Sequence, residues 1–248
     1  MNCEEISGKI VRWMRETVEG AGAAGLVTGL SGGIDSAVVL ALSARAFPEE
    51  TLGVIMPCHS SGLDEIDAVL VAEALEVPYK KVILDTVYDQ LVRAAAPEVP
   101  VEEARMAYAN LKPRLRMSTL YFEGGLRNCL VAGTGNLSEI YIGYYTKYGD
   151  GGVDLEPIGE LVKEEVRELA SWLGVPEKVI LKEPSAGLWD SQTDEEEMGF
   201  SYRELDRYIL TGQAPEPVKE RIERLRRISG HKRSMPPVCP LGLNRTSY

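Results

Sequence analysis

The chain has 248 residues, 44% hydrophobic and 26% charged, which is typical of a globular protein large enough to bury a sizeable core. Its formal net charge of −11 argues against a broad nucleic-acid-binding surface but does not exclude a site for one small anion. The sequence has no apolar run of membrane-spanning length and no signal-peptide core. We therefore expect one cytoplasmic domain over 1–248, with neither nucleic acid nor membrane as a partner.

The periodicity of apolar residues predicts an opening helix over 6–19 and then strands that alternate with helices. The predicted strands cover 25–30, 51–57, 79–85 and 129–134, and the helices between them cover 36–47, 64–75, a stretch after residue 85, and much of 101–128. After Pro157 the pattern is mostly helical, over 160–173, 176–181, 202–210 and 216–229. This alternation favours right-handed crossovers. We predict an α/β fold, a doubly wound parallel sheet with helices on both faces, and a helical C-terminal part.

The stretch GLSGGIDS at 29–36, which we call the glycine loop, lies between the first predicted strand and the following helix. Its glycines allow close approach of an anion, Ser31 and Ser36 supply hydroxyl groups, and the N–H groups of a helix start favour negative charge. A carboxylate such as Asp35 repels a polyphosphate unless a divalent cation lies between them. The loop therefore predicts a Mg²⁺-polyphosphate site. The simpler alternative is a glycine turn in which Asp35 caps the helix.

A second polar stretch, GTGNLSE at 133–139, begins where the predicted strand 129–134 ends. The carboxyl ends of parallel strands share one edge of the sheet, and ligands bind there. We therefore expect Asp35 and Glu139 to reach the same magnesium ion. The alternative is that Glu139 is an ordinary surface residue of a helix.

The glycine loop resembles the pyrophosphate loop of the N-type ATP pyrophosphatases, which adenylate an acyl oxygen and release pyrophosphate. Five further strings look like the NAD synthetase family, in that family's order: NLKPRLRMSTLY (110–121), GTGNLSE (133–139), TKYGDGGVDLEPIGELVK (146–163), KEPSAGLWDSQTDEEEMGFSY (182–202) and HKR (231–233). The resemblance runs from about residue 5 to the tail. It implies an adenine nucleotide alpha hydrolase-like fold and ammonia-dependent amidation of deamido-NAD, through an acyl-adenylate, to give NAD, AMP and pyrophosphate.

The resemblance also implies roles for individual residues. Those expected to bind ATP are Gly29, Leu30, Ser31, Gly32, Gly33, Ile34, Asp35, Ser36, Thr134, Lys163 and Ser185. Those expected to bind deamido-NAD are Arg114, Lys147, Asp154, His231 and Lys232. Mg²⁺ is expected on Asp35 and Glu139. Asp35 and Lys163 are the expected catalytic residues, and Asp150 is a candidate base for the ammonia step.

Apart from the resemblance, each of these residues has a simpler interpretation. Lys163 is then a solvated helix lysine, Arg114 belongs to a basic face near a helix end together with Lys112 and Arg116, and the residues around Asp150 form a tight turn. Lys112 and Arg116 receive no role. Gly187 stands where the family usually has an aspartate, so the role of that carboxylate is in doubt here.

Two further expectations concern the nitrogen donor and the assembly. No amidotransferase domain precedes residue 1, so free ammonia is the expected donor unless a separate subunit supplies it. The resemblance implies a symmetric homodimer. The alternatives to this function are another N-type ATP pyrophosphatase, such as a GMP synthetase or a tRNA thiolation enzyme, and a non-catalytic ATP-binding protein with the same α/β layout.

Overall fold

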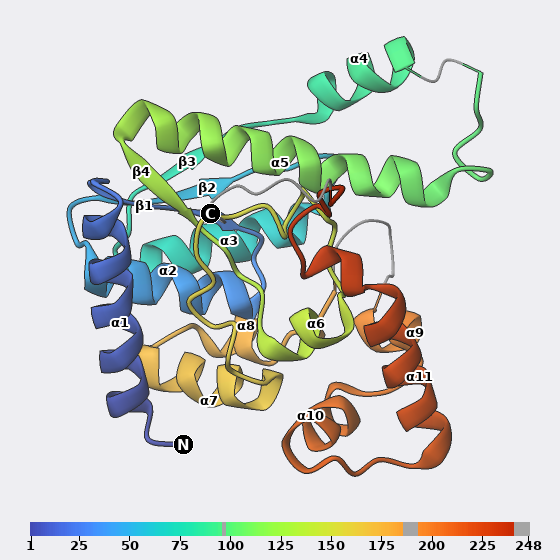
Figure 1. The fold of residues 1–248 in the computed structure, drawn as a ribbon. Coiled ribbons are helices and arrows are strands. Elements are labelled where there is room, and N and C mark those ends of the chain that lie inside the picture. The colour runs from blue at the N-terminus through green and yellow to red at the C-terminus, as the bar shows by residue number, and fades with distance from the viewer. Residues whose placement is uncertain (96–97, 186–192, 241–248) are drawn as a thin grey trace.

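The computed structural model describes residues 1–95, 98–185 and 193–240. Within them a parallel sheet has the strand order β3-β2-β1-β4 (Figure 1). The strands are β1 (Gly25–Leu30), β2 (Thr51–Ile55), β3 (Tyr79–Lys81) and β4 (Cys129–Ala132). In the central strand, Leu26 aligns with Thr51 of β2 on one side and with Leu130 of β4 on the other. The predicted parallel α/β sheet is confirmed.

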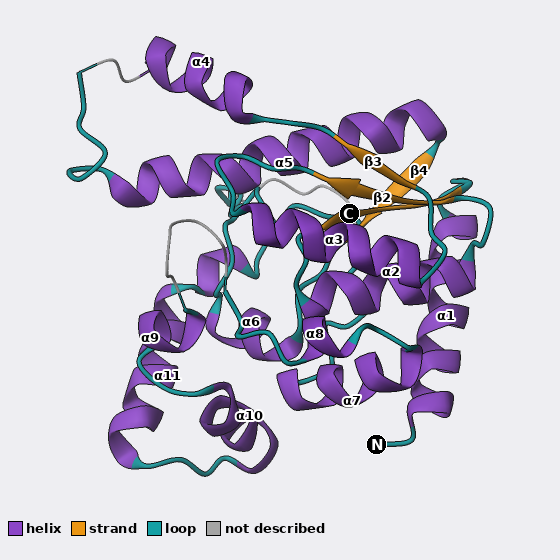
Figure 2. Ribbon diagram, turned by 180° about the vertical axis from the view of Figure 1, so that it is seen from behind, coloured by secondary structure: helices purple, strands orange, loops and turns teal. Residues whose placement is uncertain are grey.

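Helices cover both faces of this sheet (Figure 2). Helices α2 and α3 lie on one face, with α1 and α7 packed on α2, and α5 lies on the other. The helices are α1 (Cys3–Gly20), α2 (Ile34–Ala46), α3 (Gly62–Ala74), α4 (Asp85–Ala95), α5 (Arg105–Arg127), α6 (Leu137–Ile142), α7 (Lys163–Leu173), α8 (Glu177–Ile180), α9 (Asp194–Met198), α10 (Tyr202–Thr211) and α11 (Glu216–Ile228), followed by a 3₁₀ turn, η1 (Gly230–Lys232). Within the described ranges, none of them is both long and apolar enough to cross a membrane.

Helix α2 is the centre of the main core, and its sequence explains why. Most of its residues are apolar or small and buried, from Ala37 to Leu42 without interruption. A helix that is apolar all round must be covered on every side. Here the sheet covers one side of α2, and α1, α3 and α7 cover the others. The glycine loop, which leads into α2, is therefore fixed to the most buried helix of the fold.

The third strand is shorter than the sequence indicates. The apolar run predicts a strand over 79–85, whereas β3 ends at Lys81 and α4 begins at Asp85. Val82 and Leu84 still donate backbone hydrogen bonds to Ile55 and Pro57, at 2.9 and 2.8 Å. The predicted end is wrong because β2 itself stops at Ile55, so a longer ladder has no partner strand.

The C-terminal part is helical, as predicted, and has its own small core. Helices α9, α10 and α11 pack with α6 beside the sheet domain (Figure 1). The buried residues of this second cluster are Ile142, Met198, Phe200, Tyr202, Leu205 and Ile222. The short helices α6 and α9 were not predicted, because each has too few residues to show a periodic pattern of apolar side chains. Both border the site described next.

Candidate active site

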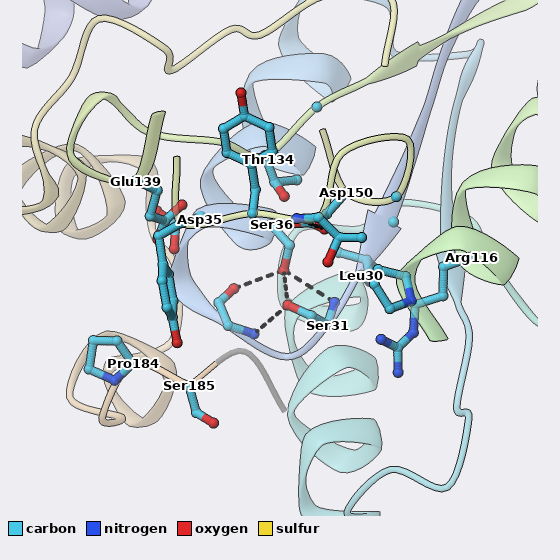
Figure 3. A pocket seen from close by; sticks show the side chains of 18 of the residues that line it. Leu30, Ser31, Asp35, Ser36, Arg116, Thr134, Glu139, Asp150, Pro184 and Ser185 are labelled. Carbon is cyan, nitrogen blue, oxygen red and sulfur yellow. Dashed lines mark hydrogen bonds between the residues drawn. The ribbon is translucent and has the colours of Figure 1, made fainter. Parts of the chain in front are cut away.

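The glycine loop is held in shape by two serine hydroxyl groups. Ser36 Oγ donates to the carbonyl of Gly33 at 2.9 Å and lies 3.1 Å from Ser31 Oγ, which in turn accepts from the Gly33 N–H at 3.2 Å (Figure 3). Gly33 is the N-cap of α2, and Asp35 lies in the first helical turn. The alternative in which Asp35 caps the helix is therefore wrong. Its carboxylate instead binds the side chains of Asn136 and Lys163.

The outer side of the glycine loop rests on α3. Gly32 has φ +78°, and a Cβ there would lie 2.3 Å from the carbonyl oxygen of Asp64, so only glycine fits. Lys182 bridges the loop and α3. Its Nζ lies 2.8 Å from carboxylate oxygens of both Asp64 and Asp67 and 3.4 Å from the carbonyl of Gly32. Lys178 binds Asp67 at 2.6 Å but has no bond to the loop among the described contacts.

Lys163 joins the two carboxylates that the sequence predicts to meet. Its Nζ lies 2.6 Å from Asp35 Oδ2 and 3.1 Å from Glu139 Oε1, although the three residues come from α7, α2 and α6. The Lys163 residue is only 2% exposed. A solvated lysine and a surface Glu139 are therefore both wrong interpretations. Burial alone would lower the pKa of Lys163, but the two carboxylates outweigh it and the pKa is raised.

Asn136 and Tyr202 orient these carboxylates. The buried Asn136 donates to Asp35 Oδ1 at 2.8 Å and accepts from the Glu139 N–H at 3.0 Å as the N-cap of α6. The Tyr202 hydroxyl lies 3.1 Å from Glu139 Oε1 and 3.0 Å from Asp194 Oδ2. Burial raises the pKa of Glu139 to about 7, in opposition to the effect of Lys163. The cluster is thus preorganised by neutral hydrogen-bonding groups around one cation.

A cavity of about 410 Å³ opens at the carboxyl ends of β1, β2 and β4. This is the edge at which ligands bind in parallel α/β sheets. The predicted residues that line it are Gly29, Leu30, Ser31, Gly33, Ile34, Asp35, Ser36, Thr134, Glu139, Asp150, Lys163, Ser185 and Lys232. The structure thus brings most of the predicted ATP residues and the carboxylate pair into one space, several of which Figure 3 labels. Gly187 lies outside the described residues.

Asp150 lines the same cavity. Its Oδ1 accepts a hydrogen bond from the backbone N–H of Thr146 at 2.9 Å. Although Asp150 as a whole residue is exposed, desolvation of its carboxyl group by the surrounding protein raises its pKa despite the bond from Thr146. A carboxylate with a raised pKa inside a cavity is suited to accept and hold a proton.

The residues predicted for deamido-NAD are not gathered in this way. Only Lys232 lines the cavity, and its Nζ donates to the carbonyl of Gly143 at 2.7 Å. Lys147 donates to the carbonyl of His231 at 2.5 Å, outside the cavity lining. The carboxylate of Asp154 accepts bonds from Tyr121 and Val131 at 3.0 and 2.8 Å. Arg114 is exposed on α5. The roles of these residues stay predictions.

Sequence reasoning missed several residues that build the site. Arg116, which received no role, lines the cavity from α5, whereas its neighbour Arg114 does not. These residues lie near the middle of a helix that continues to Arg127, so the interpretation of a basic helix end is wrong. Residues that are two positions apart in a helix, such as Arg114 and Arg116, lie on roughly opposite faces. The sequence alone does not say which of these faces points toward the cavity. Asn136 could have been found as a helix cap three residues before an acid.

The parallel sheet, with a glycine loop, a carboxylate pair on a buried lysine and a cavity at one edge, defines an α/β protein with a candidate ligand site at the carboxyl ends of its strands. The family model described as NAD synthase matches residues 6–236. The chain belongs to the NAD synthase family.

Known relatives agree with this assignment. The chain is 52% identical to the NH(3)-dependent NAD(+) synthetase of Carboxydothermus hydrogenoformans, over 96% of this chain and 98% of that one. It is 46% identical to the protein of the same name from Archaeoglobus fulgidus, over 96% and 98%. Among solved structures, NMN synthetase from Francisella tularensis has a TM-score of 0.91 at 35% identity, covering 96% of this chain and 99% of that one. The NH3-dependent NAD synthetase from Campylobacter jejuni has a TM-score of 0.79 at 30% identity, with the same coverages.

Proposed function

We propose that this chain is a ligase that joins ammonia to the nicotinate carboxyl group of deamido-NAD and consumes ATP, giving NAD, AMP and pyrophosphate. The observation that carries this proposal is the full-length similarity to NH(3)-dependent NAD(+) synthetases, at 52% identity with one of them. The cavity supports it, because the glycine loop and the cluster of Asp35, Lys163 and Glu139 lie on the same edge of the sheet. The reaction is the last step of NAD formation.

The chemistry requires activation because a carboxylate has no good leaving group, whereas AMP leaves readily from an acyl-adenylate. In this proposal Ser31, Ser36 and the N–H groups at the start of α2 bind the phosphates of ATP and then the departing pyrophosphate. Thr134 and Ser185 line the cavity with further hydroxyl groups that can donate to phosphate oxygens. The protein acts mainly by positioning and by charge compensation.

Asp35 and Glu139 are the residues that would hold Mg²⁺. Their carboxylates converge on Lys163, and oxygen ligands of this kind are those that Mg²⁺ prefers. Within the described residues no group of three or more His, Cys, Asp or Glu side chains could hold a metal, so phosphate oxygens and water would complete the coordination. With both carboxylates ionised, the two carboxylates and one lysine carry a net charge of −1, and the divalent ion would supply the charge that makes the cluster attract a polyphosphate.

Asp150 is proposed as the group that holds a proton during the ammonia step. Ammonium must lose a proton before its nitrogen attacks, and a cavity carboxylate with a raised pKa can take that proton. Arg114, Lys147, Asp154, His231 and Lys232 are proposed to bind deamido-NAD. We also propose a cytoplasmic homodimer that uses free ammonia, and sedimentation velocity of the purified protein tests its assembly state.

The test is a reaction of purified protein with deamido-NAD, MgATP and an ammonium salt. Formation of NAD, AMP and pyrophosphate in equal amounts is expected. ADP and phosphate, or no amide, would refute the ligase. Exchange of labelled pyrophosphate into ATP, dependent on deamido-NAD, separates an adenylating enzyme from a non-catalytic ATP-binding protein. Nicotinate mononucleotide should be assayed in parallel, because the fold is also similar to that of the NMN synthetase from Francisella tularensis, at a TM-score of 0.91. A larger kcat/KM for the mononucleotide would reassign the substrate.

A further inference from the structure

Arg116 places a guanidinium group in the cavity with only neutral partners. Its Nε donates to the carbonyl oxygen of Met56 at 3.1 Å, and its Nη2 donates to Ser60 Oγ at 3.0 Å. Among the residues that the structure describes, no carboxylate oxygen lies within 4.0 Å of the guanidinium nitrogens. The side chain is part of the cavity lining. Arg116 is therefore a half-buried cation that no carboxylate among the described residues pairs with.

The guanidinium group has more donors than these contacts use. It carries five N–H bonds in a rigid planar fork and cannot act as an acceptor. Two of them meet Met56 and Ser60, and the others have no hydrogen-bond partner among the described residues. Burial lowers the pKa of Arg116, and the more distant Asp150 and Asp64 do not cancel this effect. A desolvated cation is unfavourable unless an anion compensates it.

Two other cations of the cavity are already paired with carboxylates, whereas Lys232 donates to the carbonyl oxygens of Gly143 and Tyr145. Lys163 pairs with Asp35 and Glu139, and Lys182 pairs with two carboxylates on α3. In Figure 3, Asp35 and Glu139 lie on the opposite side of the pocket from Arg116, with the serines of the glycine loop between them. A ligand that lies along the loop would thus meet the carboxylate cluster at one end and Arg116 at the other.

We propose that Arg116 is an anion-binding residue of this cavity, which donates N–H groups to an oxyanion of a substrate on the side of the glycine loop away from Lys163. This inference rests on the proposed function for the identity of the ligands. A planar fork suits the paired oxygens of a phosphate or a carboxylate. The oxyanion belongs either to ATP, as a phosphate, or to deamido-NAD, as a phosphate or a carboxylate. Each of these groups offers the guanidinium group paired anionic oxygens.

The test measures binding, so that it does not depend on turnover. Calorimetry would give the affinities of MgATP alone and deamido-NAD alone for the wild type, Arg116→Met and Arg116→Lys. We expect Arg116→Met to weaken binding of one of these ligands by about 10- to 100-fold, the usual size of a lost charge-assisted bond. Arg116→Lys should recover part of the loss, since lysine keeps the charge without the fork. The ligand that is weakened identifies the source of the oxyanion.

Two controls separate anion binding from a structural role. Arg12 is exposed on α1, so Arg12→Met removes the same charge and should leave both affinities within about twofold, as for other surface substitutions. Ser60→Ala removes one partner of the guanidinium but keeps the cation. The proposal is overturned if folded Arg116→Met binds both ligands as the wild type does, or if Ser60→Ala causes the same loss. If the wild type binds ATP but forms no amide, the proposed function fails while this measurement still stands.

Discussion

Glu156 offers a sharp test of how burial controls stability next to the site. Its Oε2 accepts a hydrogen bond from the Gly135 N–H at 3.0 Å, directly behind the loop that follows β4. Burial raises the pKa of Glu156 to about 8, against the opposing effect of Gly135, and Glu139 and Asp150 raise it further. In the unfolded chain the value is the ordinary 4.5. Between these two values the folded state holds a proton that the unfolded state has lost.

The sign of the effect follows from this difference in proton binding. Because the folded pKa is the higher one, the stabilisation is complete below pH 4.5 and is lost as the pH rises toward 8. One pKa unit corresponds to about 1.4 kcal/mol, so the free energy of unfolding should fall by about 3 kcal/mol between pH 5 and pH 8 from this group. Glu156→Gln cannot ionise and keeps a carbonyl oxygen for Gly135. It should therefore gain about 3 kcal/mol over the wild type in that range.

The assay is chemical denaturation at several pH values, followed by tryptophan fluorescence. Glu123→Gln serves as the control of opposite sign, because Lys80 and Arg127 bind that carboxylate at 2.6 Å each and lower its pKa. The stability from Glu123 is present above its ordinary pKa and lost in acid, so this variant should be destabilised more at high pH. A difference between Glu156→Gln and the wild type that stays within about 0.5 kcal/mol from pH 5 to pH 8 would refute the reasoning.

Three further predictions concern the glycine loop and its neighbours. Asp35→Asn should fold normally but reduce pyrophosphate–ATP exchange by roughly 100-fold or more, because the cluster loses a charged oxygen ligand; near-normal exchange would contradict the proposed role. Gly32→Ala should destabilise the fold by about 2 to 4 kcal/mol in thermal denaturation, because φ is +78° and the added Cβ meets a backbone oxygen, whereas Gly62→Ala, with open space at its Cβ, should not. Lys182→Met should raise the KM for ATP by about tenfold, because the glycine loop loses the lysine that holds it to α3. Lys178→Met should leave this KM unchanged, since Lys178 binds Asp67 but not the loop. An equal rise in KM for both variants would mean that the loop contact of Lys182 has no role in ATP binding.

The local features of the fold could be predicted from the sequence because they depend on neighbouring residues. The alternation of buried strands with helices predicts a parallel sheet, and the glycine loop after Leu30 predicts an anion site at its edge. Both are short-range properties, set by side-chain periodicity and by turn chemistry. The end of the third strand could not be predicted in this way, because strand pairing depends on where β2 stops.

The composition of the site was decided only by the tertiary structure. Asp35 and Lys163 are far apart in the chain, and only the packing of α7 against α2 brings their charges to 2.6 Å. The spacing of Arg114 and Arg116 shows that they lie on different faces of a helix, but only the docking of α5 on the sheet selects Arg116 for the cavity. Burial likewise gives Glu156 its raised pKa. Charge compensation and desolvation depend on all the atoms around a group, and most of these atoms come from distant parts of the chain.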